Sequence, residues 1–226
     1  MLRLPKGSPL FEHLNTSTLQ LDGICTKLAQ GRFSGYANLQ FSQAHGYLLY
    51  SSGSLISVLY ESSQGICLTG TEALYVLADQ MRATTNGRLN VYRLSDDLIN
   101  YLYSLLKNDL RRDVQELLLV DIKGLLDRIR QEQLSCCLIT YTYEQATLIA
   151  YAKGVPLGFF HDGSLQFALT ADDSHRKITS SPLALLDFYI LEPEAEMQFP
   201  NLLDEVDLAA IWHAASMRHG DAAQHT

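Results

Sequence analysis

Charged residues are scarce in this chain, and basic residues are scarcer than acidic ones. Asp, Glu, Lys and Arg make up 19% of the 226 residues, and 25 acidic against 17 basic residues give a formal net charge of -8. Nucleic-acid affinity comes mostly from clustered Lys and Arg. This balance therefore disfavours a nucleic-acid partner.

Long apolar runs are also missing, although apolar residues make up 47% of the chain. No stretch approaches the roughly 18 apolar residues that indicate a membrane-spanning helix. The opening residues, Met1 to Gly7, lack the apolar core of a signal peptide. We therefore expect a globular, cytoplasmic protein with no membrane partner.

The short motifs that mark common catalytic and cofactor sites are absent. The chain has no G-x-x-x-x-G-K-[ST], G-x-G-x-x-G, G-x-S-x-G or H-E-x-x-H sequence. Its four cysteines have neither C-x-x-C spacing nor a disulfide framework, and the adjacent Cys136 and Cys137 are interpreted as packed small side chains. The seven histidines share no metal-ligand spacing. We expect no cofactor and no metal site.

The chain contains two copies of one module. A shift of 101 positions aligns Tyr50 with Tyr151 and Gly53 with Gly154, with no gap from residue 33 to residue 70. About six of the 38 aligned pairs are identical, so the relationship depends on register and hydrophobic type. The repeat predicts an α+β protein of two related modules, each a small antiparallel sheet flanked by helices.

The first module is predicted to cover residues 1–94. Its hydrophobic periods predict a meander of three strands between two helices, followed by a returning strand. A capping box at Thr69 and Glu72 is expected to start the second helix. The predicted elements are a helix over 21–28, strands over 33–41, 47–50 and 55–60, a helix burying Leu74, Leu77 and Met81, and a strand over 89–94.

Residues 95–117 are predicted to form a connecting helix that ends near Arg112, and residues 118–192 a degenerate second copy. Pro156 cannot donate to a strand ladder, so the third strand of this copy should lie at an edge or begin late. Four residues are lost after Thr170, which suggests that the capping helix is missing. A surface uncovered by that loss is a candidate interaction face.

Residues 193–226 are predicted to form a last amphipathic helix, opening at Pro200 and Asn201, and a frayed tail. Its broad apolar stripe includes Ile211 and Trp212. Such a stripe must dock, and docking on the chain itself is favoured over capture by a partner.

The best cluster of reactive side chains is the segment Phe160, His161, Asp162, Gly163 and Ser164. Adjacent residues on one turn rarely align as a catalytic triad, so a tight turn is favoured. We expect no catalytic residues. The candidate interaction residues are Phe160, His161, Asp162, Ile211 and Trp212.

The first module resembles the PATAN-type module over residues 17–94, and the second copy does so loosely. The resemblance is carried by the helix from Leu19 to Leu28, by Phe33-Ser34-Gly35, by Gly53-Ser54-Leu55-Ile56-Ser57-Val58 and by Gly70-Thr71-Glu72-Ala73-Leu74. It implies a regulatory or interaction domain of bacterial signalling.

We therefore predict a non-enzymatic adaptor, either monomer or homodimer, whose protein partner is a response regulator, a kinase or a small GTPase. Two alternatives stay open. One is a regulator or platform for a small GTPase, by analogy at the level of the fold. The other is a hydrolase-like enzyme that uses the turn at His161 and Asp162.

Overall fold

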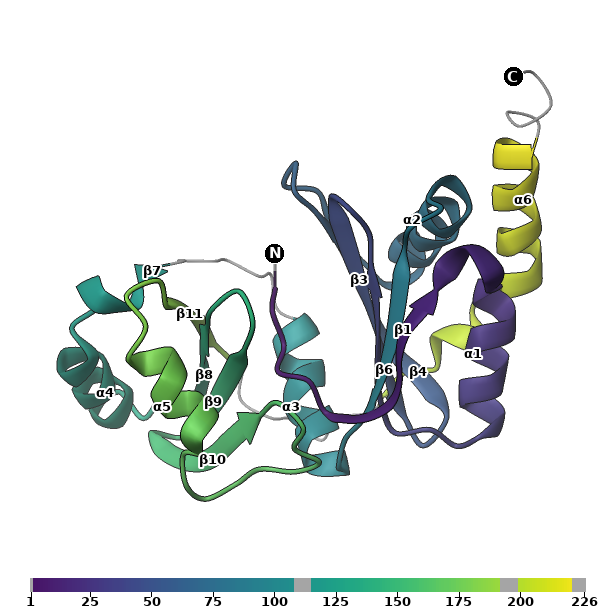
Figure 1. Cartoon of the computed structure of the whole chain (residues 1–226). Coiled ribbons are helices and arrows are strands. Elements are labelled where there is room, and N and C mark those ends of the chain that lie inside the picture. Colours follow the sequence, from purple (N-terminus) through teal and green to yellow (C-terminus); the bar gives the residue numbers. More distant parts are fainter. Residues whose placement is uncertain (1, 108–114, 192–198, 221–226) are drawn as a thin grey trace. The chain divides into compact units, whose positions relative to one another are not determined.

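The computed structural model describes residues 2–107, 115–191 and 199–220, and its chain divides into two compact units (Figure 1). Each unit has one antiparallel sheet with helices, which confirms the predicted α+β class. The unit boundaries differ from those expected from the sequence. Residues 2–8 belong to the second unit, and the last helix belongs to the first. None of the described helices is long and apolar enough to cross a membrane.

The first unit is built on a six-stranded sheet in the order β1-β6-β2-β3-β4-β5. The predicted meander and returning strand form its centre, and two strands that the sequence did not predict, β1 and β5, form its edges. Alternation of side chains places Ala37 and Leu39 on one face of β2, with Tyr36 and Asn38 on the other. The strands are β1 (Ser8–Asn15), β2 (Gly35–Gln40), β3 (Ala44–Ser51), β4 (Ser54–Ser62), β5 (Cys67–Thr69) and β6 (Arg88–Arg93).

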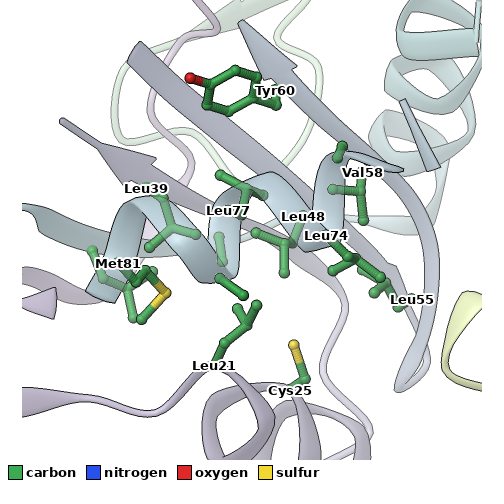
Figure 2. Close-up of a cluster of buried hydrophobic side chains, with 14 of the residues drawn as sticks. Leu21, Cys25, Leu39, Leu48, Leu55, Val58, Tyr60, Leu74, Leu77 and Met81 are labelled. Atoms are coloured by element: carbon green, nitrogen blue, oxygen red, sulfur yellow. The ribbon is translucent and has the colours of Figure 1, made fainter. Parts of the chain in front are cut away.

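Helices α1 (Leu21–Gln30), α2 (Gly70–Ala83) and α6 (Leu208–Gly220) lie on one side of this sheet in Figure 1. Leu21 and Cys25 of α1 meet Leu74, Leu77 and Met81 of α2 over the strands, as Figure 2 shows. Each fully buried leucine stabilises the fold by about 1.5–3 kcal/mol. The predicted burial of Leu74, Leu77 and Met81 is confirmed.

The predicted capping box at Thr69 does not form. Helix α2 begins at Gly70, but the Thr69 side chain makes no capping hydrogen bond. Gly70 has a φ of 62°, a conformation that glycine adopts without steric cost. The start of the helix therefore depends on this glycine and on core packing of α2.

The last helix begins later than predicted. A short 3₁₀ turn, η3 (Leu202–Asp204), follows Asn201, whose Oδ1 accepts the Leu55 backbone N–H at 3.1 Å and so fixes the turn to β4. Helix α6 then starts at Leu208, where Asp207 Oδ1 accepts the Ala210 N–H at 2.9 Å. Its docking on the chain's own body, which the sequence favoured, is what the structure shows.

Two features hold α6 against α2. The guanidinium of Arg82 lies 5.4 Å from the centre of the Trp212 ring, and Arg218 Nη2 lies 2.8 Å from Asp79 Oδ1. Ile211, Trp212 and Ala215 are buried in the same cluster as α1 and α2. Helix α6 therefore completes the first core.

Helix α3 (Asp96–Lys107) follows β6 and carries the chain from the first unit into the second. Its predicted extension to Arg112 lies outside the described residues. The Tyr101 hydroxyl donates to the Cys136 carbonyl oxygen and accepts the Tyr151 N–H at 3.4 Å. These bonds join α3 to two strands of the second sheet.

The second unit repeats the plan of the first. Its sheet has the order β10-β9-β8-β11-β7, so four strands follow the same spatial order as β4-β3-β2-β6. Pro156 lies in the edge strand β10, as predicted. The elements are β7 (Gln115–Glu116), η2 (Leu117–Leu119), α4 (Ile122–Gln131), β8 (Cys136–Tyr141), β9 (Ala146–Ala152), β10 (Val155–His161), α5 (Asp173–Thr179) and β11 (Leu185–Ile190).

The offset of 101 residues extends to individual hydrogen bonds. Gly53 N–H donates to Phe33 O, and Gly154 N–H donates to Leu134 O, both at 2.8 Å. Ser34 Oγ accepts the Ser52 N–H at 2.9 Å, and Ser135 Oγ accepts the Lys153 N–H at 3.2 Å. Gly53 and Gly154 both have positive φ, at 92° and 77°. The same turn chemistry therefore builds both copies.

The copies differ most between β10 and β11. A helix is present there, which corrects the expectation that it is missing, but α5 has seven residues where α2 has 14. Pro182 follows soon after its end and cannot continue a helix. Half of the cover that α2 gives the first sheet is therefore absent from the second.

We expect Trp212→Ala to lower the free energy of unfolding by about 3–5 kcal/mol, because it removes a buried aromatic side chain from the first core. Urea denaturation of the whole chain, followed by circular dichroism, measures this change. His213→Ala on the exposed face of the same helix is the control and should shift stability by less than about 0.5 kcal/mol. Equal effects of the two substitutions would contradict the docking of α6.

Candidate functional site: a groove in the second unit

A groove of about 660 Å³ lies on one face of the second sheet. Its floor comes from β8, β9, β10 and β11, one wall from η2 and α4, and the other from α5 and the residues after it. The lining residues are mostly apolar: Leu117, Leu118, Ile122, Leu126, Leu138, Thr140, Ile149, Tyr151, Phe159, His175, Thr179, Ser180, Ser181, Pro182 and Leu186.

Helix lengths explain why the groove exists. Asp121 Oδ1 accepts the Gly124 N–H at 3.0 Å and starts α4, which presents Ile122 and Leu126 to the groove. The opposite helix, α5, ends at Thr179. In the first unit, the side chains of the longer α2 fill the space over the strands (Figure 2).

The register of the repeat shows a change of chemistry at one end of the groove. The first copy has Leu39, Gly46 and Tyr60 on the helix-covered face of its sheet, and Gly46 lets Leu77 approach so closely that a Cβ there would lie 2.3 Å from Leu77 Cδ2. The second copy has polar side chains at all three positions. They are Thr140, Thr147 and His161, and all three are buried.

Around His161, the side chains of Thr147 and Asp172 form a connected cluster. Its Nδ1 lies 3.1 Å from Asp172 Oδ1 and 3.4 Å from Thr147 Oγ1, and its Nε2 lies 3.4 Å from the Thr170 carbonyl oxygen. Asp172 Oδ1 also accepts the His175 N–H at 2.9 Å and caps α5. The Phe159 ring stacks on His161 with centroids 5.7 Å apart. The cluster therefore anchors the short helix to the sheet.

Two buried polar atoms of the groove have no hydrogen-bond partner among the described residues. They are Thr140 Oγ1 and His175 Nδ1. Leaving such an atom unsatisfied costs about 1–3 kcal/mol. Burial lowers the pKa of His175, and the nearby His161 lowers it further, whereas Asp172 raises it. Both atoms belong to residues that line the groove, but each has less than 1 Å² of its own surface exposed.

The structure corrects four of the five candidate interaction residues. Phe160, His161, Ile211 and Trp212 are buried within their own units, so their side chains are not available to a partner. The position of Phe160 and His161 near a turn did not reveal their burial, whereas the predicted docking of the last helix on the chain agrees with that of Ile211 and Trp212. The apolar character of Ile211 and Trp212 serves the first core instead.

Asp162 is half-buried and fixes the N-terminal segment to the second unit. Its Oδ1 accepts the Lys6 N–H at 2.7 Å, and the Gly163 N–H donates to the Lys6 carbonyl oxygen at 2.8 Å. Burial raises the pKa of the Asp162 carboxyl. His161 pairs with Asp172 rather than with Asp162. The two residues of the hydrolase hypothesis therefore have separate structural partners.

The described residues contain no group of three His, Cys, Asp or Glu side chains that could hold a metal ion. Cys25, Cys136 and Cys137 are buried thiols, and Cys67 is exposed. Burial raises the pKa of Cys25 to about 11 and that of Cys136 to about 12.

Sequence reasoning missed Thr140 and His175. The signal was present in the repeat, because an apolar core position of the first copy becomes polar in the second. Thr140 takes the place of Leu39, and His175 follows the same register as Leu74. A position-by-position comparison of the copies would have singled them out.

Comparison with known proteins finds one family model that is similar to part of the chain. A family model described as "Uncharacterized protein conserved in archaea (DUF2226)" matches residues 2–106. These residues include the sheet of the first unit and nearly all of α3, and make up just under half of the chain. No curated protein matches the sequence.

Two solved structures show weak likeness to the chain. One is the DNA polymerase III beta chain of Streptococcus pneumoniae TIGR4, with 8% identity, a TM-score of 0.16 and coverage of 86% of this chain and 67% of that chain. The other is a putative DNA polymerase III beta subunit of Eubacterium rectale, with 10% identity, a TM-score of 0.13 and coverage of 85% and 68%. TM-scores this low do not indicate a shared fold or function.

We expect Ellman's reagent to label one of the four thiols quickly in the folded protein, because only Cys67 is exposed. The other three should react after unfolding in urea. Cys67→Ser is the control and should remove the fast phase. A second fast thiol in the native protein would show that one of the buried strands or helices opens.

We expect the free energy of unfolding to fall as the pH drops below about 6.5, the ordinary pKa of histidine, because the unfolded chain then binds a proton that folded His175 resists. His175→Gln should reduce this slope. Urea denaturation at several pH values measures it, with the exposed His213→Gln as control. An unchanged slope in His175→Gln would contradict the lowered pKa.

Proposed function

We propose that this chain is a non-enzymatic adaptor that recognises a protein partner with the second unit. The observation that supports the proposal is a cluster of exposed leucines at the mouth of the groove. Leu118 and Leu119 are each 77% exposed and Leu183 is 80% exposed. We call these three residues the leucine rim.

The residues of the leucine rim lie on two backbone segments that are hydrogen-bonded to each other. The Leu117 N–H donates to the Ala184 carbonyl oxygen at 2.9 Å, and Leu185 pairs with Glu116 across β11 and β7. This ladder holds Leu118 and Leu119 beside Leu183. Exposed apolar clusters on a soluble fold often mark interaction surfaces.

The first unit shows how such a surface is covered within this chain. There α6 packs on α1 and α2 with its apolar stripe. No described helix of the second unit plays that part over α4 and α5. The corresponding cover in the second unit is proposed to come from the apolar face of a partner protein.

The resemblance of residues 17–94 to the PATAN-type module supports a place in signalling. On that basis the partner is a response regulator, a kinase or a small GTPase. The separate structural partners of His161 and Asp162 support a binding role over the hydrolase-like alternative.

Affinity capture with the tagged full chain from a lysate of its source organism, with and without GTP, tests the proposal. We expect wild type to recover a signalling protein that Leu119→Glu and Leu183→Glu each lose, because a buried charge opposes apolar docking. Leu169→Glu is the matched control, since Leu169 is a 90% exposed leucine of the second unit that does not line the groove. Its recovery should equal that of wild type.

Sedimentation of the wild-type chain alone accompanies the capture. A partner recovered equally by all three variants, or no partner at all, would overturn the proposal. A wild-type homodimer that Leu119→Glu converts to a monomer would show that a second copy covers the leucine rim, and would also overturn the adaptor role of this surface.

A further inference from the structure

We propose that the groove inside the leucine rim binds a small uncharged molecule with an apolar body and a hydrogen-bonding group such as a hydroxyl, an amide or an aromatic N–H. This site would give the adaptor a ligand. The inference goes beyond the proposed function, and it depends on the interior of the groove rather than on Leu119 or Leu183.

Size and lining support a small ligand. The volume of about 660 Å³ falls within the range of about 300–1,000 Å³ that is typical of small-molecule sites. Leu138, Ile149 and Leu186 form an apolar floor, and Leu126 closes one side. An apolar ligand body would bury these side chains from water.

The polar end of the groove supports a hydrogen-bonding group on the ligand. Thr140 is only 4% exposed, its Oγ1 has no partner among the described residues, and it lines the groove together with His175. The hydroxyl can donate or accept, and the neutral imidazole offers one donor or acceptor at Nδ1. On ligand binding, Thr140 Oγ1 or His175 Nδ1 would turn toward the polar group of the ligand and be satisfied by it.

Charge distribution favours an uncharged ligand. None of the lining residues is Lys, Arg, Asp or Glu. Asp172, the carboxylate that caps α5, is already engaged by His161 Nδ1 at 3.1 Å and by the His175 N–H. A charged ligand would lose its hydration without gaining a counter-charge.

The same features argue against a leucine-faced helix as the occupant. In the first unit, aliphatic side chains of α2 cover Leu39 and Leu48 (Figure 2). In the second unit, such a face would leave Thr140 Oγ1 and His175 Nδ1 buried and unsatisfied. The interior of the groove therefore matches a molecule that carries its own polar atom.

Fluorescence titration of the full chain with N-phenyl-1-naphthylamine tests the proposal, because this neutral probe combines an apolar body with one N–H donor. We expect saturable binding of one probe per chain. Thr179→Trp, at the end of α5, should fill the groove and weaken binding at least about tenfold. Lys177→Trp is the matched control on the same helix, exposed and outside the lining, and should bind like wild type.

Two further comparisons test the chemistry. Thr140→Val should weaken the binding of N-phenyl-1-naphthylamine by about three- to tenfold. It should leave the binding of 1-phenylnaphthalene, which lacks the N–H, unchanged. The anionic analogue 8-anilinonaphthalene-1-sulfonate should bind wild type at least about tenfold more weakly.

The outcomes separate this inference from the adaptor proposal. Leu119→Glu and Leu183→Glu, which test the leucine rim, should still bind the probe. Absence of saturable binding, equal loss in both tryptophan variants, or a sulfonate that binds as tightly as the neutral probe would each overturn the ligand site. Binding that appears only when a homodimer dissociates would show that a second copy fills the groove, and would overturn it as well.

Discussion

The antiparallel sheet must bury one apolar face, and the rest of each unit follows from how that face is covered. In the first unit, α1, α2 and α6 cover it with aliphatic and aromatic side chains. In the second unit, α4 and the seven-residue α5 leave part of the face open. A helix half as long is thus enough to turn a closed core into a groove.

In the second unit, the shortened α5 and the polar substitutions on the sheet occur at the same end of the groove. A shortened helix alone would leave an apolar floor that favours aggregation or collapse. Instead, Thr140, Thr147 and His161 replace apolar or small residues of the first copy, and Asp172 ties the short helix to them. The polar end is therefore organised around a helix that no longer fills the space.

Much of the fold followed from the sequence, because period-two strands, glycine turns and the 101-residue offset each have a local physical cause. The two edge strands β1 and β5 were missed, since they lack a clear alternating pattern. The burial of His161 could not be predicted, because it depends on its pairing with Asp172 at the start of α5. Docking of the Trp212 stripe on the chain was predicted, but its place beside Arg82 of α2 was not. The groove was anticipated only as a surface left by the four lost residues.

The assignment of α6 to the first unit has a consequence for the order of synthesis. Residues 9–99 leave the ribosome early, but the helix that completes their core is the last described segment to be made. The apolar faces of α1 and α2 therefore stay uncovered by α6 until residues 208–220 have been made, after the second copy has been translated. During that interval α4 and α5 expose a similar uncovered face, which is an alternative docking surface for α6.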